Sequence, residues 1–325
     1  MGLAPDNIAH LHIGSDTGHG NEASEVIISA SRRTDLPAFY SEWLMNRVRA
    51  GYCLVPNPFN RDQISRVSLE PPDVDGIVFW TRNPRPLFPY LSELDDRGYR
   101  YYFLYTLMAN PRQIDPGSPP AETSIETLRE LSRRIGQRRV VWRYDPILLS
   151  NLTGPDFHLR SYRRIAAALK GYTTRSVVSI AHIYRKIQKR IACLAKQGIH
   201  LLPYDEKVLS PLMSSLAEIA SENGMEIQSC ADELDLHRFG IRPGKCVDDD
   251  LISEVFGLDF KAKKDVCQRK QCGCVASKDI GMYDSCLFGC SYCYATGSFE
   301  RAKANYRMHD PGSASLLGRH GQDET

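Results

Sequence analysis

The sequence predicts an α/β fold built on a parallel (β/α) barrel, partial or full. Short apolar runs rich in β-branched and aromatic residues alternate with longer amphipathic stretches, which is the pattern of a parallel sheet. Roughly six or seven such units follow one another in about 200 residues, which favours one barrel over separate domains. A doubly wound open sheet is the alternative, but no glycine-rich phosphate fingerprint follows the first strand.

The expected strands and helices alternate from the start of the barrel. The strands are the short runs at 26–30, 76–80, 101–105, 140–142, 176–180, 200–202, 225–228 and 279–283, of which 200–202 is the weakest. The helices are the amphipathic stretches at 40–50, 87–96, 124–135, 157–169, 184–197, 209–223 and 299–308.

The chain is expected to divide into five segments. Residues 1–24 form a flexible N-terminal segment, 25–229 the barrel and 230–278 a cysteine-rich segment with a possible auxiliary metal site. Residues 279–309 supply a final strand, a cysteine loop and a helix that close the barrel, and 310–325 form a flexible tail.

Composition bounds the class of protein. The 325 residues are 42% hydrophobic and 25% charged, as in a globular protein with a sizeable core. No apolar run is long enough for a membrane-spanning helix, and no signal peptide is recognised, so we expect a cytoplasmic protein without a membrane partner. In that compartment ten cysteines indicate metal or redox chemistry rather than disulfides. A net charge of +2 is too mild to favour nucleic acid as a partner.

Three cysteines near the C-terminus have the spacing C-x3-C-x2-C. They are Cys286, Cys290 and Cys293, with Tyr292 just before the third. Three thiolates on one loop can hold three irons of a [4Fe–4S] cluster and leave the fourth iron open to a small ligand. Zinc is the alternative, but closed zinc sites use four protein ligands, and no fourth Cys or His stands at the expected spacing.

A second group of cysteines lies between the last barrel strand and this loop. Cys246, Cys272 and Cys274, with Cys230 as the favoured fourth ligand, could hold a second [4Fe–4S] cluster. Cys267 is the alternative to Cys230. A zinc site that staples an irregular segment, or plain unliganded thiols, are the other interpretations of this group.

The remaining cysteines, the histidines and the basic run have simpler interpretations. Cys53 and Cys193 lie in apolar stretches and are expected to be core residues. The histidines show no metal-ligand spacing, and those at 10, 12 and 19 fall in the polar N-terminal segment. The basic run at 185–190 could attract nucleic acid or a phosphorylated substrate, but a solvated helix face is the favoured interpretation.

Polar residues follow the expected strands. In a βα barrel the loops after the strands form the active-site face, so these residues predict a pocket for a zwitterionic, partly aromatic ligand. They are the segments at 31–35, 80–83, 105–106, 143–146, His182 and 230–233. Arg143, directly after a Val-Val-Trp run, is suited to hold a carboxylate bidentately. Helix caps and surface ion pairs are the alternative for each segment.

Together, four segments resemble one bacterial and archaeal family, known as domain of unknown function 1848. They are Ser29-Ala30-Ser31-Arg32-Arg33-Thr34-Asp35, Phe79-Trp80-Thr81, Trp142-Arg143-Tyr144-Asp145-Pro146 and the run at 286–295. The resemblance extends from about residue 25 to 309. The three-cysteine run also resembles the signature of radical S-adenosylmethionine (SAM) enzymes, and the Arg-x-Asp-Pro segment is similar to the spore photoproduct lyase branch of them.

The resemblance implies a cofactor set and roles for individual residues. It implies a [4Fe–4S] cluster on the three cysteines, SAM on its open iron, and a reductant such as flavodoxin or ferredoxin. Tyr292 is expected against the adenosine and Arg143, with Asp145 beside it, near the SAM carboxylate or ribose. The Gly-Gly-Glu motif that many relatives use for the SAM amino group is missing, and Asp35 or Thr81 could take that role.

The order of the motifs differs from ordinary radical SAM enzymes, which carry the cysteine loop after their first strand. Here the loop comes last, so we expect a circular permutation in which the strand at 279–283 pairs beside 26–30. The expected activity is reductive cleavage of SAM and radical chemistry on an unidentified substrate, with cleavage of a different SAM bond also possible. The alternatives are a non-catalytic, metal-stabilised barrel that binds a partner, or a DNA-lesion lyase.

Overall fold

An eight-stranded parallel sheet lies at the centre of the computed structural model, which describes residues 26–60, 62–203, 205–231 and 234–318. Its order is β10-β1-β4-β5-β6-β7-β8-β9, and every neighbouring pair is parallel. The strands are β1 (Ile27–Ala30), β4 (Gly76–Thr81), β5 (Tyr101–Thr106), β6 (Val140–Ile147), β7 (Arg175–Ile180), β8 (Glu226–Ser229), β9 (Arg242–Pro243) and β10 (Lys278–Asp279). The predicted α/β fold with a large parallel sheet is therefore confirmed.

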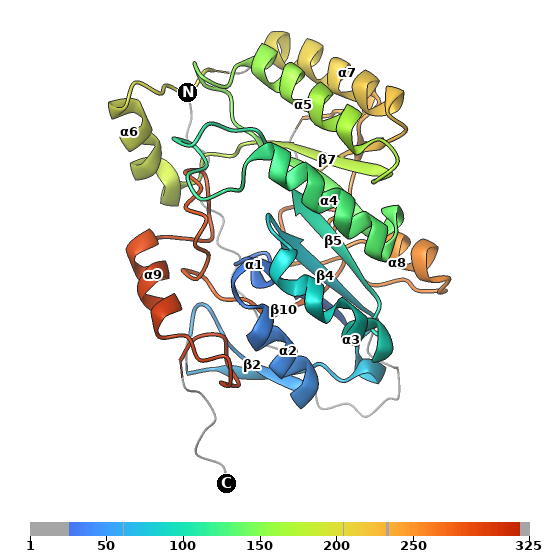
Figure 1. The fold of residues 1–325 in the computed structure, drawn as a ribbon. Coiled ribbons are helices and arrows are strands. Elements are labelled where there is room, and N and C mark those ends of the chain that lie inside the picture. The colour runs from blue at the N-terminus through green and yellow to red at the C-terminus, as the bar shows by residue number, and fades with distance from the viewer. Residues whose placement is uncertain (1–25, 61, 204, 232–233, 319–325) are drawn as a thin grey trace.

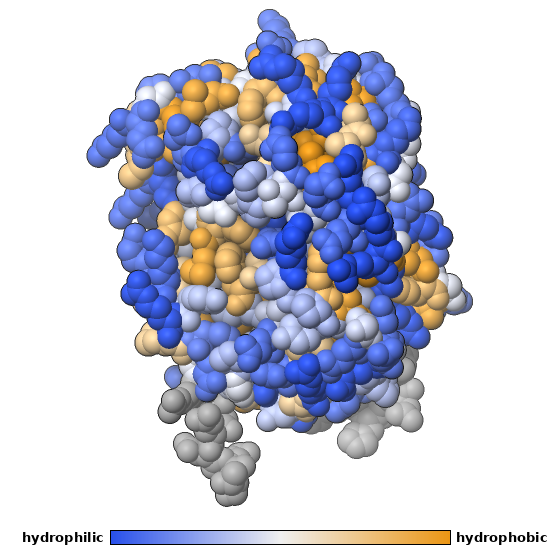
Figure 2. Space-filling model, viewed as in Figure 1, coloured by the Kyte–Doolittle hydropathy of each residue, from blue (hydrophilic) through white to orange (hydrophobic). Residues whose placement is uncertain are grey.

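Helices connect the strands, and α2, α4, α5 and α7 cover one face of the sheet, as α4 does in front of β5 in Figure 1. They are α1 (Leu36–Phe39), α2 (Ser41–Ala50), α3 (Leu91–Asp96), α4 (Ala121–Ile135), α5 (Pro155–Leu169), α6 (Gln188–Lys196), α7 (Glu206–Glu222), α8 (Asp249–Phe256) and α9 (Phe299–Arg307). Short 3-10 helices cover Pro71–Asp73, Arg85–Tyr90, Gln137–Arg139, Arg185–Ile187 and His237–Phe239. The outer face of the molecule in Figure 2 is mostly hydrophilic, with separate apolar patches.

The two faces of the sheet bury different partners because successive side chains of a strand point to opposite faces. On the helix-covered face, Ile28, Phe79 and Phe103 pack in one large core with apolar residues of α2, α4, α5 and α7. On the other face, the neighbouring residues Ile27, Val78 and Tyr102 pack against the cysteine-rich stretch from Cys246 to Val275. This stretch, which includes α8, therefore covers the second face of the sheet.

The last strand pairs with the first. Lys278 and Asp279 of β10 lie opposite Ile28 and Ser29 of β1, and the Ile280 N–H donates to the Ser29 carbonyl at 3.1 Å. The strand is shorter than the expected 279–283, because the chain leaves the sheet after Ile280 to begin the cysteine loop. The C-terminal segment thus lies at the edge of the sheet beside β1.

Some elements differ from the prediction. The expected strand at 200–202 makes only an isolated antiparallel bridge, between Leu201 and Ser150, and does not join the sheet. The antiparallel pair β2 (Tyr52–Pro56) and β3 (Ile64–Ser68) was not expected, nor were α8 and β9. The expected helix at 87–96 is a 3-10 helix followed by α3, because Pro86 and Pro89 lack the backbone donors of a continuous α-helix.

The C-terminal segment is more ordered than the expected flexible tail. Within 310–318, the Ser313 carbonyl accepts a hydrogen bond from Trp43 Nε1 at 2.9 Å, and the Ala314 carbonyl accepts from the Leu54 N–H at 2.9 Å. Leu316 is buried against the same region. The remainder of the tail, 319–325, and the N-terminal segment 1–24 lie outside the described residues.

Among the described residues, none of the helices combines the length and the apolar character needed to cross a membrane.

Candidate functional site

A cavity of about 290 Å³ opens at the carboxyl ends of the parallel strands. In parallel α/β sheets this edge is where ligands bind, because the loops after all strands meet there. Residues at or just after the carboxyl ends of β1, β4, β6, β7 and β8 line the cavity, and so do both cysteine groups. The fold thereby brings together two sets of thiols that are separated in the sequence.

The first cysteine group lies on the loop between β10 and α9. The loop is docked on the segment after β5: the Gly117 N–H donates to the Phe288 carbonyl at 2.9 Å, and the Ser291 N–H donates to the Ile114 carbonyl at 3.0 Å. Gly289 adopts a positive φ of 71°, which lets the loop turn between Cys286 and Cys290. All three cysteines of this group line the cavity.

Arg190 of α6 holds the same loop from another side. Its guanidinium donates to the carbonyls of Ser291 at 3.1 Å and Thr296 at 2.5 Å, and also to that of Cys293. Arg190 belongs to the basic run that the sequence favours as a solvated helix face, and for this residue that interpretation is wrong. One arginine thus fixes three backbone carbonyls around the third cysteine.

The spacing of the three thiols is wider than a preformed zinc site requires. Tetrahedral zinc with Zn–S bonds of about 2.3 Å places its sulfur ligands about 3.8 Å apart. Among the described residues, the Sγ atoms of Cys286, Cys290 and Cys293 do not all lie within 4.8 Å of one another. The three thiols are therefore not preorganised as a tetrahedral zinc site.

The protein environment favours the protonated form of two of these thiols. Burial raises the pKa of Cys286, and neighbouring Cys293 and Asp35 raise it further. Burial also raises the pKa of Cys290, although the positive charge of Arg82 acts in the opposite direction. Metal binding at this loop would therefore release protons, since the thiolate is the ligand.

Tyr292 is fixed by a buried polar network. Its hydroxyl donates to Asp115 Oδ2 at 2.8 Å and accepts from Arg82 Nη2 at 2.5 Å. Arg82 Nη1 also lies 3.5 Å from Asp115 Oδ2. The tyrosine lines the cavity with its ring position set by these two charged partners.

Asp35 and Thr81 line the cavity too, but their polar atoms are largely occupied. Asp35 Oδ1 accepts from the Ala38 N–H at 2.9 Å, which caps α1, and Oδ2 accepts from the Arg82 N–H at 2.6 Å. Burial raises the pKa of Asp35 to about 7, against the effect of these hydrogen bonds. Thr81 Oγ1 accepts from the Asn83 N–H at 2.9 Å. The helix-cap interpretation therefore holds for Asp35.

Two buried polar atoms at the cavity have no partner among the described residues. They are Thr34 Oγ1 and Arg32 Nη2. Unpaired buried polar atoms are uncommon in folded proteins because each costs on the order of 1–3 kcal/mol. Their position at the cavity is typical of groups that pair with a bound ligand.

The second cysteine group converges on the same cavity. Cys230 Sγ lies 3.3 Å from Cys246 Sγ, and the backbone N–H groups of Cys246 and Val247 approach Cys274 Sγ at 3.3 and 3.4 Å. Hydrogen bonds from Cys246 and Cys272 lower the pKa of Cys274, and a hydrogen bond from Cys246 lowers that of Cys230. The four side chains form one connected chain of thiols.

Cys267 does not join this group. It is exposed, its N–H donates to Asp265 Oδ1 at 2.9 Å, and it is not among the residues that line the cavity. The structure brings Cys230, rather than Cys267, to the other three cysteines.

Arg143 faces the second cysteine group. Its Nη1 lies 2.9 Å from Cys246 Sγ, Nε donates to Asp145 Oδ2 at 3.0 Å, and Nη2 contacts the same carboxylate oxygen. Ser179 Oγ donates to the other oxygen of Asp145. Arg143 and Asp145 thus form a buried pair at the cavity, and the guanidinium stacks 4.9 Å from the centre of the Trp80 ring.

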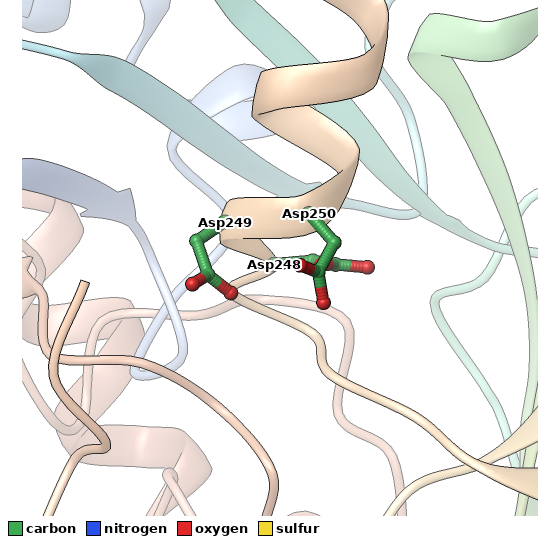
Figure 3. A group of neighbouring side chains, drawn as sticks. All are labelled: Asp248, Asp249 and Asp250. Carbon is green, nitrogen blue, oxygen red and sulfur yellow. The ribbon is translucent and has the colours of Figure 1, made fainter. Parts of the chain in front are cut away.

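Three aspartates at the start of α8 gather their carboxylates, as Figure 3 shows, but basic residues already neutralise them. Asp248 caps α8 and pairs with Arg175 at 2.8 Å. Asp249 and Asp250 each lie 2.7 Å from Lys245 Nζ. This cluster is explained by helix capping and ion pairs.

The other cysteines and His182 were also predicted from the sequence, and the structure places them as follows. Cys53 is buried in β2 as expected, whereas Cys193 is exposed, because α6 buries Leu194 instead. His182 lines the cavity and is exposed. Asp232, Glu233 and the histidines at 10, 12 and 19 lie outside the described residues.

Asp115 and Arg190 were missed by the sequence reasoning as residues of this site. Asp115 lies in a loop between β5 and α4, and Arg190 lies on a helix surface, so neither has a local motif that indicates the loop it contacts. Their roles depend on contacts with residues about one hundred or more positions away in the chain.

Comparison with known proteins identifies the family but no activity. No curated protein matches the chain. A solved structure described as a putative alpha-L-fucosidase from Bacteroides thetaiotaomicron aligns with 74% of this chain and 83% of its own, at 9% identity and a TM-score of 0.27, too weak a likeness to bear on fold or activity. The family model described as Domain of unknown function (DUF1848) matches residues 27–295. On that match, which covers most of the chain including both cysteine groups, the protein belongs to the DUF1848 family.

Proposed function

We propose that this protein is a radical SAM enzyme in which Cys286, Cys290 and Cys293 ligate a [4Fe–4S] cluster. The observation that carries the proposal is the position of a three-cysteine loop: it directly follows an edge strand of a parallel sheet and lines the cavity at the strands' carboxyl ends. Three ligands leave one iron open, and the cavity gives a small molecule access to it. When bound, the cluster would supply one electron for reductive cleavage of the SAM sulfonium, giving methionine and a 5′-deoxyadenosyl radical that takes a hydrogen atom from a substrate.

The chain's own residues fit the task of holding such a cluster. The donor set is three thiols, with a spread wider than a preformed tetrahedral zinc site. Arg190 and the loop after β5 hold the loop backbone, so that loading the cluster would require little reordering of the chain. Thiolates held by backbone that is already ordered bind metal with a smaller entropic cost.

Groups at the cavity are suited to orient SAM. Thr34 Oγ1 and Arg32 Nη2 are buried and unpaired, and they could donate to the carboxylate or ribose oxygens of SAM. Tyr292, held by Arg82 and Asp115, presents an aromatic surface that would pack on the adenosine. Arg143 and Asp35, which have protein partners already, would contribute mainly charge to this wall.

We further propose that the sheet is a circularly permuted (β/α) barrel of the radical SAM type. The order strand, cysteine loop and helix is present as β10, residues 280–298 and α9, with β10 paired in parallel beside β1. The local unit that opens an ordinary radical SAM barrel would therefore occupy the same place in the sheet, although it is encoded last.

The mild net charge and the cavity volume of about 290 Å³ favour a small-molecule substrate over a nucleic acid. The electron would come from a reductant such as flavodoxin or ferredoxin, and the cavity walls would exclude water from the reacting centre.

Anaerobic purification and metal analysis test this function. We expect iron and sulfide in the protein, and 5′-deoxyadenosine after addition of dithionite and SAM. A Cys290→Ala variant should lose about four irons per chain and all 5′-deoxyadenosine formation, because a cluster of this type needs all three thiolates. Cys193→Ser is the control, because Cys193 is an exposed cysteine on α6 that does not line the cavity. Zinc without iron, or normal 5′-deoxyadenosine formation in Cys290→Ala, would refute the proposal and favour a metal-stabilised binding module.

A further inference from the structure

We propose that Cys230, Cys246, Cys272 and Cys274 ligate a second [4Fe–4S] cluster, fully coordinated by protein, on the same cavity as the first. This site is separate from the one in the proposed function, and neither depends on the other for its ligands.

The four cysteines come from three separate segments, and the fold brings them together. Cys230 follows β8, Cys246 precedes α8, and the pair Cys272 and Cys274 lies in the loop before β10. The contacts run from Cys230 to Cys246 at 3.3 Å and from the Cys246 N–H to Cys274 Sγ at 3.3 Å. Each of the four also lines the cavity. Packing of these segments alone would not require four cysteines at one place, because other small side chains could fill the same space.

The backbone around these cysteines is built for close approach. A Cβ on Gly273, between Cys272 and Cys274, would lie 3.1 Å from the Gly244 carbonyl oxygen. A Cβ on Gly244 would lie 2.6 Å from Gln228 Oε1 and 3.1 Å from the Ser229 carbonyl oxygen. Glycine at both positions lets the segments that carry the cysteines pack directly on one another.

A rigid support fixes the segment that carries Cys246. The buried Tyr102 hydroxyl donates to the Cys246 carbonyl at 2.5 Å and accepts from the Asp248 N–H at 2.9 Å. The Val275 N–H donates to the Val247 carbonyl at 3.1 Å, which ties this segment to the one that carries Cys274. Ligand-bearing loops that are fixed by buried hydrogen bonds are typical of metal sites.

Positive charge surrounds the group, as an anionic metal–thiolate cluster requires. Arg143 Nη1 lies 2.9 Å from Cys246 Sγ, and Arg32 interacts electrostatically with Cys274. Two backbone N–H groups point at Cys274 Sγ. Hydrogen bonds and charges of this kind stabilise iron–sulfur clusters and set their reduction potentials. Four neutral, unliganded thiols carry no negative charge that two nearby guanidinium groups would balance.

The four thiols are not arranged as a preformed tetrahedral zinc site. Four sulfur ligands of one zinc ion lie about 3.8 Å apart in every pair. Among the described residues, no three of these four Sγ atoms all lie within 4.8 Å of one another, although Cys230 and Cys246 lie 3.3 Å apart and Cys274 interacts with both Cys246 and Cys272. A [4Fe–4S] cluster has four irons to distribute among its ligands and spans a larger space.

Two full-length variants test the second cluster. In the first, Cys286, Cys290 and Cys293 are all changed to alanine; we expect about four irons per chain and a [4Fe–4S] Mössbauer spectrum to remain, with no response to SAM. In the second, Cys246→Ser and Cys274→Ser are combined; we expect iron to fall from about eight to about four per chain, with the SAM-dependent change in the electron paramagnetic resonance signal retained. Cys267→Ser is the control for a nearby exposed cysteine and should keep about eight irons.

The outcomes separate this proposal from the proposed function. A triple-alanine variant without iron would overturn the second cluster, and so would one zinc per chain that the double-serine variant loses. Should the double-serine variant fail to fold, the triple-alanine variant alone decides, because its remaining iron can lie only on other ligands. If instead the double-serine variant retains iron but shows no response to SAM, the proposed function fails while the second cluster stands.

Discussion

Buried charged side chains at the cavity are held in fixed positions by other charged groups. Arg143 is paired with Asp145, and Arg82 with Asp115 and Tyr292, all with little exposure to solvent. Pairing of this kind is needed because an unpaired buried charge is costly. It also fixes the positions of the charged groups in the cavity walls, so that a cofactor can bind them without reorganisation of the protein.

Arg143 should therefore affect the second cysteine group more than the first. In an Arg143→Met variant the positive charge beside Cys246 is lost, so we expect the reduction potential of the second cluster to fall. Potentiometric titration followed by electron paramagnetic resonance measures this change. Arg143→Lys keeps the positive charge and should shift the reduction potential less, although it loses the two contacts that Nε and Nη2 make with Asp145. An unchanged potential in Arg143→Met would contradict the assigned contact.

His158 predicts a pH dependence of stability that is independent of any metal. It is fully buried, its Nδ1 lies 2.9 Å from the Tyr144 hydroxyl, and burial lowers its pKa from 6.5 to about 4. Between these two values the unfolded chain binds a proton that the folded chain does not, so stability falls as the pH drops below about 6.5. The effect is fully developed below about pH 4.

A comparison of wild type with His158→Gln isolates this residue. Between pH 7.5 and 5, the free energy of unfolding should fall by about 2 kcal/mol more in the wild type than in the variant. Urea denaturation at both pH values measures the difference, in which other titrating groups cancel. Parallel losses in the two proteins would show that His158 does not titrate in this range.

At the scale of elements, sequence periodicity located most of the sheet. The apolar runs that became β1, β4, β5, β6, β7 and β8 are buried along most of their length, as strands of a parallel sheet covered on both faces are, whereas residues 200–202 are largely exposed. The helix α8 was missed although Asp248 caps it, because it lies inside a segment whose cysteines indicated irregular structure. The cysteine loop was located by its own spacing, but its contacts with Arg190 and the loop after β5 are tertiary and leave no local pattern.

The contact between the two loops can be tested with one added methyl group. In Gly117→Ala the new Cβ would lie 2.5 Å from the Phe288 carbonyl oxygen and 2.9 Å from its Cα, so the cysteine loop would have to shift. We expect a loss of about 1–3 kcal/mol in the free energy of unfolding and weaker iron retention. Gly154→Ala is the matched control, since its Cβ would have no neighbour closer than 3.8 Å. Equal stability of the two variants would exclude this close approach.

At the scale of the whole molecule, Asp279 joins the end of the chain to its beginning. Its carboxylate accepts from Ser29 Oγ at 2.8 Å, Ser31 Oγ at 2.7 Å and the Arg32 N–H at 2.8 Å. It also accepts from the Gly281 N–H at 3.1 Å, where the cysteine loop begins. One side chain thus connects β1, β10 and the first cysteine group.

Removal of this carboxylate should separate the C-terminal unit from the sheet. Asp279→Ala leaves several donors unpaired, so we expect a loss of about 2–4 kcal/mol in unfolding free energy and faster proteolysis near β10. Glu254→Ala, which breaks an exposed ion pair with Arg138, should change stability by less than about 0.5 kcal/mol. A loss in Asp279→Ala no larger than in Glu254→Ala would argue against a joining role.

The most direct test of the account is whether SAM binds iron at the cluster held by Cys286, Cys290 and Cys293. Electron–nuclear double resonance on the dithionite-reduced protein, with SAM carrying ¹⁷O in its carboxylate, measures that contact. We expect a ¹⁷O coupling in the wild type that is lost in Cys290→Ala. An iron-containing protein without that coupling would contradict it, because every iron of the cluster would then be closed to the cofactor.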